Sequence, residues 1–133
     1  MSGATIIWNK LKSNANLIAV VPATKIRPEG IKLNTVLPAI GVTNLPGSHW
    51  KQIREDGSPK FRTNRVQVTI AAKTILSRKQ ALELVQDAVI SSYGLIGGVF
   101  CNSVVEDNQG PEFNDEEKEI YTTSQDFIVS YTR

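Results

Sequence analysis

His49 and Cys101 are the residues of this 133-residue sequence best suited to nucleophilic chemistry, and each is the only one of its type. A thiolate activated by an imidazole can attack a carbonyl carbon, and the two groups need to be neighbours only in space. His49 lies in the polar run Gly-Ser-His-Trp, whereas Cys101 lies in an apolar segment. A lone cysteine in such a segment usually packs as a small core residue. We therefore predict no catalytic residue and expect that the protein is not an enzyme.

Metal binding is the next chemistry that the residue types suggest. One histidine and one cysteine are too few for a zinc cluster, which takes about four such ligands. The acidic run 107–119 offers the oxygen ligands that Ca²⁺ and Mg²⁺ take, and Asn108–Glu119 has the length of a calcium-binding loop. Pro111 and Phe113, however, interrupt the ligand spacing. We expect no metal site and no cofactor.

Two segments offer features that could bind phosphate or nucleic acid. The glycines of 94–98 follow a predicted helix and precede a predicted strand, the reverse of the order in a phosphate-binding loop. Four basic residues surround a predicted strand that begins with Phe61: Arg54, Lys60, Arg62 and Arg65. A basic sheet face with aromatic side chains can hold a single strand. No recognised nucleic-acid-binding signature is present. A small nucleic-acid-binding module is therefore kept only as an alternative function.

Hydrophobic periodicity predicts the elements that must position these side chains. We predict helices over 4–18 and 77–93 and strands over 35–45, 61–73, 99–106 and 120–131. A polar connection over 45–60 contains a short strand near Trp50 and Ile53, and Gly94, Gly97 and Gly98 make a turn. One face of the first helix carries Ala4, Ile7, Trp8, Leu11, Ala15 and Ile18. The second helix is predicted to start at Ser77, with Gln80 completing a capping box, and to end before Gly94. Its apolar face holds Ala81, Leu84, Val85, Ala88 and Val89, with Leu82 at the border.

The order of these elements predicts the fold class. A chain of this length makes about one domain, and strands in runs with only two helices indicate an α+β fold. We expect an antiparallel or mixed sheet with two main helices packed on one face, in a single domain over residues 1–133. Val66, Val68 and Ile70 alternate with polar residues, which is typical of a sheet buried on one face. No apolar run reaches the 18 residues of a membrane-spanning helix.

Charge is divided unevenly along the chain. Residues 1–80 hold 13 of the 15 basic residues and 3 of the 13 acidic ones, whereas 81–133 hold 2 basic and 10 acidic residues. A chain with one positive and one negative region can bind a copy of itself head to tail, because complementary potentials steer the contact. The alternative is that both charge runs are simply solvated.

The order and spacing of several motifs resemble a known group of proteins. An Arg-x-Gln-Val strand, 65–74, precedes the helix Ser77–Val89, and an alternating strand, Tyr121–Tyr131, closes the chain. Arg27-Pro28 precedes a Pro-led strand at 37–40. This layout is similar to that of the tail-completion or tail-terminator proteins of long-tailed bacteriophages. The chain departs from them at Ala71 and Ala72, where members often carry an aromatic residue, and in a long acidic loop at about 107–119.

The resemblance implies a structural virion protein that forms a ring of six copies on the tail tube. The ring would stop tube growth, join the tube to the head connector and pass DNA through its lumen. It would assemble in the host cytoplasm and involve no membrane. The residues expected at its contacts are Arg54, Lys60, Arg62, Arg65, Glu112, Asp115, Glu116, Glu117 and Glu119. The acidic loop would meet a neighbouring subunit, dock on the tube or connector, or line the lumen. Another neck or tail adaptor is the alternative.

Overall fold

A seven-stranded mixed sheet runs through the described part of the chain, which comprises residues 3–28, 31, 37–52, 61–90, 93–96 and 98–132 of a computed structural model. The strands are β1 (Ile26–Arg27), β2 (Ala39–Gln52), β3 (Phe61–Ala72), β4 (Gly94–Ile96), β5 (Val99–Gln109), β6 (Phe113–Asp115) and β7 (Ile120–Thr132). The helices are α1 (Gly3–Ser13), α2 (Ala15–Ile18) and α3 (Ile75–Val89), with a 3₁₀ turn, η1 (Ala23–Lys25). The sheet order is β1-β2-β3-β7-β5-β4, and β6 pairs with β7.

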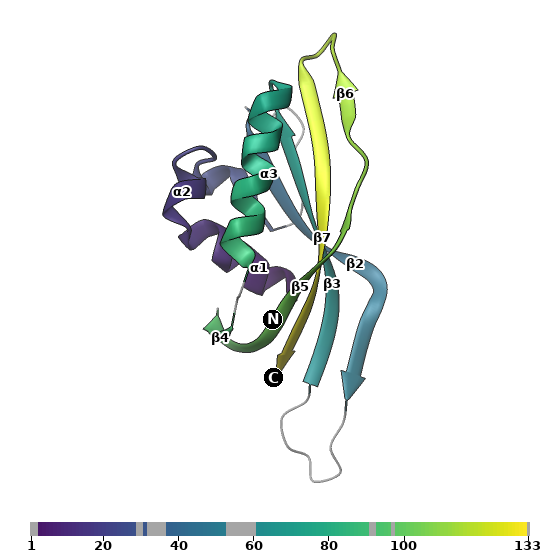
Figure 1. The fold of residues 1–133 in the computed structure, drawn as a ribbon. Coiled ribbons are helices and arrows are strands. Elements are labelled where there is room, and N and C mark those ends of the chain that lie inside the picture. Colours follow the sequence, from purple (N-terminus) through teal and green to yellow (C-terminus); the bar gives the residue numbers. More distant parts are fainter. Residues whose placement is uncertain are drawn as a thin grey trace.

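The helices pack on one face of this sheet (Figure 1). The pair β1–β2 is parallel and the remaining pairs are antiparallel. The predicted α+β class is therefore confirmed, as is the predicted strand over 61–73. None of the helices in the described ranges is long and apolar enough to cross a membrane.

The core lies between the helices and the covered sheet face. Its strand residues alternate along β3 and β7 as predicted, and the fully buried ones include Val66, Val68, Ile70, Phe127 and Val129. The helices contribute Ile7, Leu11 and Val85, which are also fully buried. Each such side chain stabilises the fold by roughly 1.5–3 kcal/mol relative to an exposed one.

The first helix is not continuous, and the prediction was wrong in this respect. Asn14 interrupts it, because its side-chain oxygen accepts a hydrogen bond from the backbone N–H of Leu17 at 2.9 Å and caps a new helix, α2. The break rotates the following turn. Leu17 is consequently buried, whereas Ala15 and Ile18, both predicted for the apolar face, are exposed.

The start of α3 differs from the predicted capping box. Thr74 is the N-cap, and its hydroxyl accepts a hydrogen bond from the backbone N–H of Ser77 at 3.0 Å. The helix therefore begins at Ile75, two residues before the predicted start. Leu82 lies in the buried face and Leu84 at its border, the reverse of the predicted assignment.

The end of α3 also differs. The helix ends at Val89 rather than Tyr93, and Gly94 does not cap it. Gly94, with φ of 100°, instead opens the short strand β4, which pairs antiparallel with β5. The predicted glycine turn is thus partly a strand at the edge of the sheet.

Strand β2 is longer than predicted. It starts directly after Pro38, as expected for a residue that cannot donate to the ladder, but it continues to Gln52. The predicted polar connection from Leu45 therefore belongs to β2 up to Gln52, and its pairing with β3 shifts register between Asn44 and His49. Ile53 and the rest of the connection to residue 60 lie outside the described residues.

Candidate functional site

The predicted acidic loop over 107–119 is instead a β-hairpin, and this prediction is corrected. Strand β5 continues to Gln109, and β6 then pairs with β7, with Asp115 opposite Ile120. Glu119 adopts a positive φ of 54° in the turn. Lys118 donates its backbone N–H to the Asp115 carboxylate at 3.2 Å. Charged side chains can point into solvent from a two-stranded ladder, so acidity did not prevent strand formation. We call residues 106–123 the acidic hairpin.

Gly110 sets the path of the acidic hairpin between β5 and β6. Its backbone N–H donates to the carbonyl oxygen of Ser124 at 2.8 Å. A Cβ atom at this position would collide with the hydroxyl oxygen of Ser124. A larger residue at this position would therefore require the Ser124 side chain to rotate away.

Arg78 attaches the acidic hairpin to α3. Its guanidinium contacts the Asn114 side-chain oxygen at 2.6 Å and the Glu112 carboxylate at 3.0 Å. The carbonyl oxygens of Phe113 and Thr122 lie at 3.5 Å. The Arg78 side chain is 4% exposed, whereas that of Glu112 is 55% exposed. A buried guanidinium with this many oxygen partners fixes the hairpin in one direction relative to the helix.

Sequence reasoning missed Arg78, although a signal was available. Arg78 precedes Ala81 by three residues and Leu82 by four, so it shares the buried face of α3 with both. An arginine on an apolar helix face needs an acceptor in the structure. The pattern would have predicted a buried ion pair without identifying Glu112 as its partner.

A second ion pair joins Arg65 on β3 to Asp107 on β5. The guanidinium nitrogen and the carboxylate oxygen are 2.7 Å apart, and the side chains are 39% and 30% exposed. Arg65 alternates with the buried Asn64 and Val66, so the pair lies on the sheet face away from the helices. Such a partly exposed pair contributes about 0–1 kcal/mol.

The structure separates the predicted contact residues instead of gathering them. Arg65 and Glu112 already have partners within the chain. Arg62 lies at the other end of the sheet from the turn of the acidic hairpin, in register with Tyr131. The carboxylates exposed at or beside that turn are Asp115, Glu116, Glu117 and Glu119. Arg54 and Lys60 lie outside the described residues.

The strands that carry His49 and Cys101 are not neighbours in the sheet. The two residues occupy β2 and β5, between which β3 and β7 intervene. Three strand spacings amount to about 14 Å. Cys101 is fully buried, and burial raises the pKa of its thiol although a hydrogen bond to Ser103 lowers it. A raised pKa keeps the thiol neutral. Among the described residues, no three His, Cys, Asp or Glu side chains are grouped to hold a metal.

A groove separates α3 from the acidic hairpin. Its volume is about 440 Å³, and its lining residues are Ile75, Arg78, Lys79, Leu82, Glu83, Gln86, Gln109, Glu112 and Thr123. Thr123 is only 2% exposed, yet its hydroxyl oxygen has no hydrogen-bond partner. Most buried hydroxyls have a hydrogen-bond partner. The groove therefore contains a buried hydroxyl whose hydrogen-bonding capacity is unused. Nothing in the sequence indicated it, because its two walls come from distant segments.

The fold is similar to that of a chain in a solved structure described as "Virion of native gene transfer agent (GTA) particle". The TM-score is 0.72, and the similarity covers 99% of this chain and 96% of that chain. The sequences are 11% identical, so the likeness establishes the fold. No protein-family profile matches this chain, and no curated protein matches its sequence. The chain thus shares its fold, nearly end to end, with a component of a virion particle.

Proposed function

We propose that this protein is a structural virion protein that forms a ring on the head-proximal end of a phage tail tube. The ring joins the tube to the head connector, and DNA passes through its lumen. The near end-to-end likeness to a virion chain carries this proposal. A fold alone hosts many functions. The specific role therefore draws also on the motif order that resembles tail-terminator proteins.

The distribution of charge supports a ring. A closed ring needs a contact between two different surfaces of the same chain. The turn of the acidic hairpin and Arg62 lie at opposite ends of the sheet, so they suit neighbours that meet head to tail. The ring contains six copies by analogy with the proteins that the sequence resembles.

The acidic hairpin is the proposed contact with a neighbour, the tube or the connector. Its exposed carboxylates would also repel the phosphates of DNA, so DNA would not bind to the wall of the lumen. Reversing two charges, Glu116→Lys with Glu117→Lys, should leave the fold intact, because both side chains are exposed. Ring formation or tail joining should fall at least tenfold, measured by electron microscopy and by counting joined particles. Unchanged assembly and joining would exclude this use of the hairpin.

The decisive experiment compares particles assembled with and without this protein. A tail terminator predicts overlong, headless tails in its absence, because tube growth would not stop. A neck adaptor without terminating activity predicts tails of normal length that lack heads. Joined particles with normal tails would overturn the proposal. Salt-sensitive DNA binding by the purified protein would then favour a nucleic-acid-binding module.

A further inference from the structure

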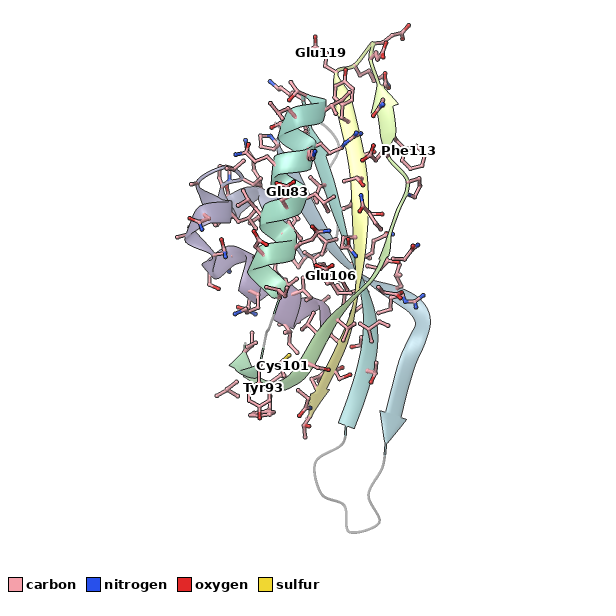
Figure 2. All side chains as sticks on the ribbon, in the orientation of Figure 1. Glu83, Tyr93, Cys101, Glu106, Phe113 and Glu119 are labelled. Carbon is pink, nitrogen blue, oxygen red and sulfur yellow. The ribbon has the colours of Figure 1, made fainter. Side chains whose placement is uncertain are left out.

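An exposed apolar cluster lies at the end of the sheet far from the acidic hairpin. Tyr93 and Leu95 are 70% and 76% exposed, and Leu95 pairs across the strands with the exposed Phe100. The rings of Tyr93 and Phe100 meet edge to face, with centroids 5.3 Å apart. Figure 2 shows Tyr93 at this end, beside Cys101. We call Tyr93, Leu95 and Phe100 the aromatic patch.

The aromatic patch lies on the edge of the sheet. Strand β4 is the last strand in the sheet order. Edge strands present backbone groups for pairing, and natural proteins usually protect them with charges or cover them. No charged residue stands within β4 or at Tyr93, and the side chains are large and apolar. This surface has the composition of the centre of a protein interface.

The groove beside α3 is the complementary surface at the other end. It is concave, its rim carries the exposed Ile75, and its floor holds the unpartnered hydroxyl of Thr123. Thr123 and Thr132 both lie on β7, and Phe100 pairs with Thr132. The two threonines are nine residue steps apart along the strand, about 30 Å. One copy therefore cannot place its own patch in its own groove.

The two ends of the sheet carry charges of opposite sign, which also favours a contact between them. Arg62 on β3 is a basic residue at the patch end of the sheet. At the groove end, the acidic hairpin holds five carboxylates besides the paired Asp107 and Glu112, and the basic residues there are Lys118 and, on the groove wall, Lys79. A contact that brings patch to groove also brings opposite charges together. This complementarity selects a second copy of the chain as the occupant of the groove.

We propose that the aromatic patch of one copy docks in the α3–hairpin groove of the next copy, so that copies associate head to tail. Such a contact is heterologous and closes into a ring or grows into a filament, depending on the rotation between neighbours. Closure of this contact into a ring rests on the proposed function. The contact between two copies does not require a tail tube.

Site-specific cross-linking of the full chain tests the contact. Leu95→Cys puts a thiol in the patch, and Lys79→Cys puts one at the groove. With a short bis-maleimide, a mixture of the two variants should give covalent dimers at least tenfold more abundantly than either variant alone. The unsubstituted chain is the control, because its Cys101 is buried. Equal dimer formation by a single variant would show a symmetric contact and overturn the proposal, as would a mixture without dimers.

A second pair of variants tests the patch without cross-linking. Tyr93→Ser with Leu95→Ser should weaken self-association at least tenfold in sedimentation equilibrium. The matched control is Ile18→Ser, an exposed apolar residue on α2, which should leave association unchanged. Circular dichroism melts check that each variant folds. Association within twofold of the original protein would overturn the proposal.

These results separate the contact from the proposed function. Cross-linked copies together with tails of normal length in the absence of the protein would support the contact and refute the terminator role. Overlong tails in its absence, without cross-linking in the mixture, would support that role and refute the contact.

Discussion

The helix-covered middle of the sheet and the acidic hairpin are stabilised in different ways. In the middle, Ile7, Val68 and Phe127 are fully buried in a continuous apolar cluster. Burial of this kind is non-directional and is shared among many side chains. The hairpin has no comparable core. Phe113 is exposed, and besides the backbone pairing of β6 with β7, Arg78 ties the hairpin to α3.

The buried core therefore determines the stability of the fold, whereas the Arg78 contacts determine the orientation of the acidic hairpin, the proposed contact surface. Loss of a core side chain should lower the free energy of unfolding of the whole chain. Loss of the Arg78 contacts should release the hairpin while the rest remains folded. Each substitution below tests whether the two regions behave as two cooperative units.

The largest effect is expected at Phe127. Phe127→Ala removes a fully buried ring from β7 and leaves a cavity, so the free energy of unfolding should fall by about 3–5 kcal/mol. Urea denaturation followed by circular dichroism measures it. The matched control is Phe113→Ala in the hairpin, which should change the value by less than about 0.5 kcal/mol because that ring is exposed. Similar losses of stability for both variants would contradict the distinction between the covered middle of the sheet and the acidic hairpin.

A smaller, local effect is expected at Arg78. Arg78→Met keeps the apolar stem but removes the contacts to Glu112 and Asn114. Backbone amides of the hairpin should exchange about tenfold faster with deuterium, since a charged hydrogen bond is worth about 1.5–3 kcal/mol.

Hydrogen exchange with mass spectrometry resolves the hairpin peptides from the core. Lys79→Met, one residue further and exposed, is the control and should alter neither region. Equal acceleration throughout the chain would show that the hairpin and the core unfold together, contrary to the comparison.

The sequence predicted the covered middle well, because periodicity reports burial directly. Alternation at Val66, Val68 and Ile70 and the apolar face around Val85 both correspond to buried residues. The errors arose where a local hydrogen bond overrides periodicity. Asn14 caps a second helix, and Thr74 caps α3 before the predicted start. Both residues compete for backbone groups through short polar side chains.

The candidate site was predictable only in its composition. The sequence predicted 107–119 as an acidic loop, but these residues pair with β7, which follows later in the chain. The partners of Arg65 and Arg78 likewise come from β5 and the hairpin. Pairing across 34 or more residues cannot be deduced from spacing, because the sheet order decides it. Contacts between copies are harder still to predict, because they depend on surfaces that form only once the chain has folded.

The smallest effect is expected at the other ion pair, which sharpens the contrast with Arg78. Arg65 and Asp107 are each about a third exposed, so water and salt screen their attraction. Asp107→Asn with Arg65→Gln should lower the free energy of unfolding by less than about 1 kcal/mol. Urea denaturation at low and at roughly 1 M salt measures it, and the high-salt difference should approach zero. A loss that persists in high salt would mean that this pair, too, acts as a structural clamp. The distinction between a buried and an exposed arginine would then fail as an account of how the hairpin is held.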